Sequence, residues 1–206
     1  MKVLIINGSP HEKGNTGIAV EEAVKQFAKN GVDTEVLHIG MNAVRGCVAC
    51  MSCMKNGKCV FDDDVNKAAA KFEQADGLIV ASPVYYASPN GTILSFLDRL
   101  FYSTHFDKRD KVGAAITVAR RAGTVAAYEV LNKYFTIAGM PIAGSQYWNV
   151  VFGQKIGQAS EDGEGLQTMR VLADNMTFLM KSIALGKEKY GLPAQEERVW
   201  TNFVKQ

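Results

Sequence analysis

The sequence predicts a three-layer α/β fold in which helices cover both faces of a doubly wound, five-stranded parallel sheet. Apolar runs of strand length alternate along the chain with segments whose apolar residues recur at helical spacing. The strand runs are apolar almost throughout, as in parallel strands that are buried on both faces. No repeat or linker divides the 206 residues. We therefore expect one domain over residues 1–190 and an extension over residues 191–206.

Each expected element has a local justification. The first strand is a β-branched run that Gly8, Ser9 and Pro10 close with a turn. The first helix ends at Asn30 and Gly31, and acidic residues at positions 62–64 open the second helix, where they suit the helix dipole. The later helices show apolar residues three and four apart. Strands are expected over residues 2–7, 34–39, 77–82, 111–119 and 141–151. Helices are expected over residues 16–30, after residue 62, from residue 90, over 124–138 and from residue 164.

Composition excludes several classes of partner. The net charge of +2 gives no reason to expect nucleic acid or a membrane surface as partner. The apolar run at the N-terminus is too short for a signal peptide, and no stretch is long enough to span a membrane. We expect a cytoplasmic protein, in which structural disulfides are disfavoured.

All four cysteines of the chain lie within thirteen residues, in a loop over residues 46–60 that follows the second strand. Their spacing is C-x2-C-x2-C-x5-C, so four thiolates from one loop can meet at a metal centre. A [4Fe-4S] cluster, a zinc ion and free or redox-sensing thiols all remain open on the residues alone. Zinc is less favoured, because zinc sites more often use two separated pairs of cysteines. The candidate ligands are Cys47, Cys50, Cys53 and Cys59.

The loop after the first strand, residues 7–16, has the composition of a phosphate site. It is neither a P-loop nor a GxGxxG motif, but it offers the hydroxyls of Ser9 and Thr16, the amide of Asn15 and a helix N-terminus. In a doubly wound sheet this loop lies at the carboxyl edge, where ligands bind. We expect it to hold a phosphate monoester. The alternative is an ordinary turn in which Asn15 or Thr16 caps the helix.

Three segments together resemble one family. GSPHEKGNT, over residues 8–16, resembles the FMN-phosphate loop of the flavodoxin-like NAD(P)H-dependent FMN reductases. The segment 82–91, SPVYYASPNG, is similar to the SP-x-Y segment that borders the flavin ring in that family. The cysteine run resembles the compact motif of iron–sulfur flavoproteins. The resemblance covers at least residues 1–185, and it implies a flavodoxin-like domain that binds FMN and a [4Fe-4S] cluster.

The resemblance also implies which residues contact FMN. Phosphate contacts are expected from Ser9, Asn15 and Thr16, with His11 nearby. The loop 119–124 would lie beside the pyrimidine edge of the flavin, where a positive charge favours the reduced, anionic ring. Arg120 and Gly123 belong to this loop, although Arg120 could equally form a surface ion pair or a subunit contact. The ring itself would be contacted by Pro83, Val84, Tyr85 and Tyr86, with Ser88 and Gly91 below them.

The implied function is that of an oxidoreductase. Electrons would pass between NAD(P)H, or a low-potential donor of the ferredoxin type, and a small-molecule or protein acceptor. No general acid or nucleophile is expected, and His38 is interpreted as structural. An electron carrier without enzymatic activity is an alternative, although such carriers are typically acidic. A redox or metal sensor that uses the cysteine loop is another.

The last sixteen residues carry two large aromatic side chains, Trp200 and Phe203. We expect this extension to pack across a neighbouring subunit of a homodimer or homotetramer, with packing on its own domain as the alternative. We further expect the cysteine loop to share the sheet edge that holds the flavin.

Overall fold

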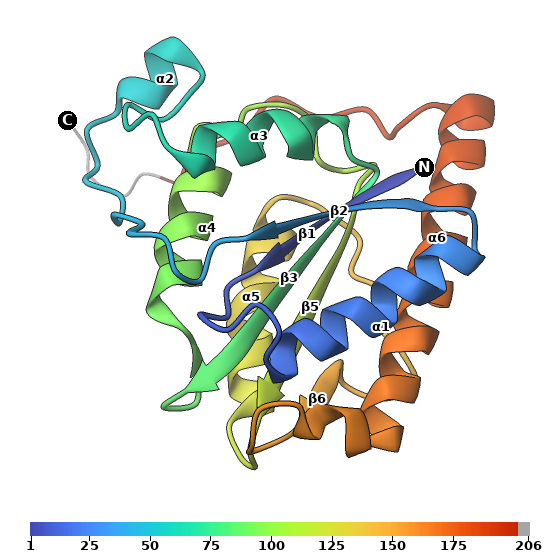
Figure 1. Ribbon diagram of the computed structural model, residues 1–206. Helices are drawn as coiled ribbons and strands as arrows, with labels where there is room; N and C mark the ends of the chain where they lie inside the picture. Colours follow the sequence, from blue (N-terminus) through green and yellow to red (C-terminus); the bar gives the residue numbers. More distant parts are fainter. Residues whose placement is uncertain (202–206) are drawn as a thin grey trace.

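The computed structural model describes residues 1–201 and shows a mixed sheet between two layers of helices (Figure 1). The strand order is β2-β1-β3-β5-β6, and every neighbouring pair along it is parallel. A two-residue strand, β4, pairs antiparallel with the end of β3. The five-stranded parallel sheet is therefore confirmed. The strands are β1 Lys2–Asn7, β2 Asp33–His38, β3 Gly77–Tyr85, β4 Ser88–Pro89, β5 Val112–Ala119 and β6 Val150–Phe152.

Both faces of the sheet carry a buried core, which is why its central strands are apolar almost throughout. Along β1, Val3 and Ile5 face one core and Leu4 and Ile6 face the other, and all four are fully buried. Helices α1 and α6 cover the first face, and α3, α4 and α5 cover the second. The helices are α1 Asn15–Lys29, α2 Ser52–Asn56, α3 Asp64–Gln74, α4 Gly91–Ser103, α5 Thr124–Ile137 and α6 Gly163–Tyr190, with a short 3-10 helix, η1, over Gln158–Glu161.

The expected fifth strand over residues 141–151 is wrong over most of its length. Ile142 forms one isolated bridge to Gly113, and regular pairing begins only where Val150 meets Thr117. Between these pairs β5 advances by four residues and the other chain segment by eight, so four extra residues must leave the sheet. The exposed Tyr147 and Trp148 lie in this excursion. The apolar pattern of the segment had suggested one continuous strand.

The remaining differences are small. The third strand continues past residue 82 to Tyr85, and β2 begins one residue earlier than expected. The short helix α2 inside the cysteine loop was not predicted. Among residues 1–201, no helix combines the length and the apolar character needed to cross a membrane.

Beyond α6, the chain returns along its own domain toward the cysteine loop (Figure 1). The Arg109 guanidinium donates a hydrogen bond of 2.8 Å from Nη1 to the carbonyl oxygen of Pro193. Trp200 remains 73% exposed on the single chain. Phe203, the second aromatic residue of the expected subunit arm, lies outside the described residues.

Candidate functional site

From β1 the chain adds β2 on one side of the sheet and then β3, β5 and β6 on the other, so the topological switch point lies between β1 and β3. The loops that follow these two strands flank the switch point. Asn90 joins the two loops. Its Nδ2 donates a hydrogen bond to the carbonyl oxygen of Gly8, while its Oδ1 caps α4 by accepting one of 3.1 Å from the backbone N–H of Ile93. Asn90 is 4% exposed. The sequence analysis had not assigned it a role, although an Asn before an apolar helical pattern is a capping signal.

The phosphate loop closes on itself and leaves the start of α1 open. The Ser9 hydroxyl accepts a hydrogen bond of 3.1 Å from the backbone N–H of His11, and Gly14 donates one of 3.0 Å to the carbonyl oxygen of His11. The N-cap of α1 is Gly14, and no side chain in the described part of the chain caps it. The alternative of a helix capped by Asn15 or Thr16 is therefore wrong. The first N–H groups of α1 are available to an anion.

The side chain of Asn15 is directed elsewhere. Its Nδ2 donates a 3.0 Å hydrogen bond to the carbonyl oxygen of Lys155, and its Oδ1 accepts one of 3.0 Å from the backbone N–H of Ala159. A phosphate contact from Asn15 would thus come from its backbone N–H. Thr16 is buried, whereas His11 is exposed beside the loop.

The segment after β2 packs tightly against the phosphate loop. The Nε2 atom of His38 lies 2.6 Å from the carbonyl oxygen of Ser9, which agrees with a structural role for His38. A Cβ atom at Gly40 would lie 1.8 Å from the same oxygen. Only glycine fits at position 40 while the loop keeps this course.

The segment expected to border the flavin forms a two-residue hairpin between β3 and β4. Tyr85 pairs with Ser88, and the two residues between them, Tyr86 and Ala87, have φ angles of +50° and +59°. Two positive φ angles define a type I′ turn, which asparagine and glycine normally occupy. Tyr86 is fully exposed and Tyr85 is half-exposed, so both rings are free to meet a ligand. Pro83, Val84 and Ser88 are half-buried. Gly91 starts α4, and apart from its chain neighbours and the adjacent helix backbone no heavy atom of the described chain lies within 4 Å of a hypothetical Cβ there.

The loop 119–124 reaches this hairpin. Gly123 has a φ of +90°, and a Cβ atom there would lie 2.8 Å from the Cα of Ala87. Arg120 and Arg121 are exposed on the same loop. The structure thus brings together the three segments that the sequence analysis assigned to one ligand.

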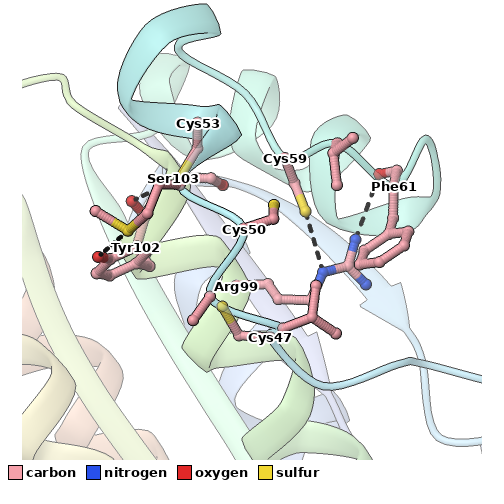
Figure 2. Close-up of a pocket in the computed structure, with 12 residues that line it drawn as sticks. Cys47, Cys50, Cys53, Cys59, Phe61, Arg99, Tyr102 and Ser103 are labelled. Atoms are coloured by element: carbon pink, nitrogen blue, oxygen red, sulfur yellow. Dashed lines mark hydrogen bonds between the residues drawn. The ribbon is translucent and has the colours of Figure 1, made fainter.

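The four cysteines line one cavity, together with residues of α4 (Figure 2). All four thiols are free; Cys53 is buried, Cys59 is partly buried, and Cys47 and Cys50 are exposed. Between the first three cysteines, Ala49 and Met51 adopt φ angles of +50° and +58°. Backbone strain of this kind at non-glycine residues concentrates at functional sites. Among residues 1–201, no three His, Cys, Asp or Glu side chains are arranged as they would be around a metal ion.

A buried arginine, Arg99, lies against the cysteine cavity and was missed by the sequence analysis. Its Nε donates a hydrogen bond of 3.2 Å to the Sγ of Cys59, as Figure 2 shows. Its two terminal nitrogens bind the Asp63 carboxylate at 2.7 and 2.8 Å. Burial alone would lower the pKa of Arg99, but the hydrogen bonds with Asp63 and Cys59 outweigh burial and raise it.

The cysteine cavity and the β3–β4 hairpin lie at opposite ends of α4. The cavity touches Arg99, Tyr102 and Ser103 in the last turn of this helix, whereas the hairpin joins its start at Gly91. Twelve residues separate Gly91 from Ser103, a rise of about 18 Å. The expectation that the cysteine loop shares the sheet edge of the flavin is therefore wrong. The loop begins at that edge but folds back over α3 and α4 (Figure 1).

Two features of the cavity fit an iron–sulfur cluster. Four thiols from one loop supply its ligand set. The hydroxyl of Ser103, a buried side chain that lines the cavity, has no hydrogen-bond partner within residues 1–201. A buried hydroxyl without a partner is costly, and a bound group can supply that partner.

Comparison with known proteins agrees with this geometry. The model of the NADPH-dependent FMN reductase family matches residues 1–155. An iron–sulfur flavoprotein from Methanocaldococcus jannaschii is 32% identical over 191 residues, which cover 89% of this chain and 99% of that protein. Among solved structures, RosB with bound 8-demethyl-8-formylriboflavin-5'-phosphate has a TM-score of 0.70 at 15% identity and covers 100% of this chain and 94% of that one.

A flavodoxin from the domain Archaea has a TM-score of 0.58 at 16% identity and covers 89% of this chain and 99% of that one, which shows that the fold is flavodoxin-like. The family model spans about three quarters of the chain, and the M. jannaschii relative aligns over nearly its whole length. The chain therefore belongs to the NADPH-dependent FMN reductase family and is an NAD(P)H-dependent flavin oxidoreductase.

Proposed function

We propose that FMN binds at the switch point between β1 and β3, with its phosphate at the open start of α1. The observation that supports this most is the pair of loops that Asn90 joins around an uncapped helix N-terminus. The phosphate would be held by Ser9, by the backbone N–H groups of Asn15 and Thr16, and by His11 at the rim. The ring would lie against Pro83, Val84, Tyr85 and Tyr86, with Ser88, Gly91, Arg120 and Gly123 around it.

Bound FMN would supply hydride and single-electron transfer. The protein's own residues would bind the flavin and orient its ring. The half-exposed ring of Tyr85 offers an aromatic face for stacking. The positive charge of Arg120 would stabilise negative charge at the pyrimidine edge. No side chain is assigned as a general acid, base or nucleophile, because none is needed to deliver a hydride to a flavin.

We further propose that Cys47, Cys50, Cys53 and Cys59 hold a [4Fe-4S] cluster. The shared cavity, the free thiols and the hydrogen bond from Arg99 to Cys59 support this proposal. The names of the curated relatives, iron–sulfur flavoproteins, support it as well. Zinc is the less favoured occupant.

The surface around the cysteine loop supports a protein as one redox partner. Four apolar side chains of the loop, Val48, Met51, Met54 and Val60, are each about half exposed. Arg45, Lys55 and Lys58 are exposed beside them. A small apolar surface with basic residues around it suits an acidic electron-transfer protein of the ferredoxin type. NAD(P)H and small-molecule acceptors would instead reach the flavin end of the molecule.

The test is anaerobic purification with quantitation of flavin, iron, sulfide and zinc, followed by steady-state turnover with NADH, with NADPH and with reduced ferredoxin. We expect about one FMN and four irons per chain. A Cys50→Ser variant should lose iron and keep FMN, while a Cys-preserving control, Ser52→Ala, should keep both. Zinc together with FMN would contradict the cluster and leave the flavin site intact. Rapid reduction by ferredoxin, without turnover of either nucleotide, would favour an electron carrier or a sensor.

A further inference from the structure

Helix α4 presents two hydrogen-bond donors to the cysteine cavity from consecutive turns. Arg99 and Ser103 are four residues apart, so they lie on the same face of the helix. Both side chains are almost fully buried, with 1% and 3% of their surface exposed. Both line the cavity that the four cysteines share.

The guanidinium of Arg99 is fixed so that only Nε faces a sulfur. The Asp63 carboxylate binds both terminal nitrogens, and the carbonyl oxygens of Arg45 and Phe61 accept further hydrogen bonds of 3.2 and 3.3 Å from them. A forked arginine–carboxylate pair has one orientation, which a lysine would not reproduce. The remaining Nε–H points at the Sγ of Cys59.

Asp63 does not cancel the positive charge of Arg99 at the sulfur. The carboxylate binds the two terminal nitrogens of the guanidinium, whereas Nε–H, on the other side, faces the sulfur of Cys59. The sulfur therefore lies nearer to the positive guanidinium than to the negative carboxylate. Ser103 adds a second donor whose hydroxyl has no partner within the described residues. Hydrogen bonds to cluster sulfurs raise the reduction potential, because they stabilise the more negative, reduced state.

We propose that Arg99 and Ser103 are positioning residues that hold the cluster's sulfur atoms by hydrogen bonds and raise its reduction potential. This inference rests on the proposed cluster. Arg99 fixes the Cys59 ligand through a hydrogen bond from Nε–H. Ser103 donates a hydrogen bond from its hydroxyl to a sulfur atom of the cluster. Together they would keep the cluster reducible by the same donors that serve the flavin.

The test compares anaerobically purified wild-type protein with Ser103→Ala and Arg99→Lys. Ser95→Ala is the matched control, because Ser95 lies on the same helix and does not line the cysteine cavity. Iron and sulfide content, the electron paramagnetic resonance spectrum and the midpoint potential are measured for each. Ser103→Ala should keep four irons and FMN but lower the ratio of reduced to oxidised cluster at a fixed potential several-fold. For a one-electron couple, a tenfold change corresponds to about 59 mV.

Arg99→Lys should shift the potential further in the same direction and alter the resonance spectrum, because the Cys59 ligand is no longer fixed. Ser103→Ala removes only a hydroxyl, so it keeps the test decisive if Arg99→Lys does not fold. If both variants load iron and keep the wild-type midpoint potential, the inference about Arg99 and Ser103 is overturned, whereas the proposed cluster is supported. A wild-type protein without iron after anaerobic purification would overturn the cluster, and this inference with it.

Discussion

At the scale of single residues, Gly40 fixes the course of the phosphate loop, because a Cβ atom there would lie 1.8 Å from the carbonyl oxygen of Ser9. Gly40→Ala must therefore displace the phosphate loop at Ser9. We expect FMN to bind at least about tenfold more weakly, which is about 1.4 kcal/mol. The dissociation constant can be measured by the quenching of flavin fluorescence.

The control for that variant is Gly186→Ala. Gly186 lies within α6, and apart from its chain neighbours and the adjacent helix backbone no heavy atom of the described chain is within 4 Å of a Cβ atom built there. This variant should keep the affinity for FMN and raise the free energy of unfolding by about 0.5–1 kcal/mol, the usual gain of alanine over glycine in a helix. Equal FMN affinity in Gly40→Ala and Gly186→Ala would show that Gly40 does not determine the course of the phosphate loop.

Asp63 links the start of α3 to the buried Arg99, and its loss should show a defined pH dependence. Burial alone would raise the pKa of Asp63, but hydrogen bonds from Arg99 and from the backbone N–H of Val65 outweigh burial and lower it. A carboxylate whose pKa is lowered by folding stabilises the protein above its unfolded pKa of about 3.9. That stabilisation is lost as the pH falls through the lower, folded value.

Asp63→Asn should therefore lower the free energy of unfolding at pH 7 by about 2–3 kcal/mol, because it leaves a buried guanidinium without its carboxylate. The Asp63 side chain is 37% exposed, so we expect less than the full cost of a buried pair. Urea unfolding, with FMN and iron content matched, should show the difference from wild type shrink below about pH 4. Asp64→Asn removes the charge of a carboxylate whose partners, Lys67 and Asn42, are both at exposed contacts, so it should cost less than about 1 kcal/mol. A difference that stays constant with pH would contradict the assigned role.

At the scale of elements, the β3–β4 hairpin carries strain that one substitution can relieve. Ala87 holds a φ of +59° in the type I′ turn. Alanine in this region costs about 1–2 kcal/mol, and glycine avoids that cost but loses about 0.4–1 kcal/mol through the unfolded state. Ala87→Gly should thus stabilise the protein by about 0.5–1 kcal/mol in thermal or urea unfolding and leave the FMN content unchanged.

The same substitution within a helix should have the opposite sign. Ala126 is exposed in the first part of α5, where Ala→Gly costs about 1 kcal/mol. If both variants destabilise the protein equally, the turn at Ala87 is not strained.

The sequence predicts those elements whose signal is local. The run KVLIIN gives β1 its correct bounds, and the carboxyl-edge rule brings the phosphate loop, the 82–91 segment and Gly123 together. Arg99 escapes prediction because its partners come from distant segments. Asp63 is 36 residues away and Cys59 is 40 residues away. A charged residue beside the buried Leu100 in an apolar helical pattern is the only local signal.

The direction of the Asn15 side chain is likewise a long-range property. Its partner Lys155 is 140 residues away, in the loop between β6 and η1. Spacing along the chain predicts a helix from residue 16, one residue after the observed start at Asn15. It does not show which part of the chain returns to meet its amide.

At the scale of the whole molecule, α4 separates two ends with different chemistry. Its start, capped by Asn90, supports the loops of the flavin end, and its last turn supports the cysteine cavity. The C-terminal segment, residues 191–201, contributes side chains to the cysteine end. Gln195 and Arg198 line a groove of about 950 Å³ next to Cys47 and Met54. A change in this segment should therefore act on the cysteine end and leave the flavin end unchanged.

Deletion of residues 191–206 tests the extension as a subunit arm. Trp200 is 73% exposed on the single chain, and such a surface is more stable when another subunit covers it. We expect the wild-type chain to form a dimer or tetramer, the truncated chain to show fewer subunits per particle by light scattering, and FMN to remain at about one per chain. Trp200→Ala in the full chain should also lower the number of subunits, because it removes the exposed ring while it keeps the Arg109–Pro193 hydrogen bond. A truncated protein with an unchanged number of subunits would place the segment on its own domain, where its hydrogen bond with Arg109 lies.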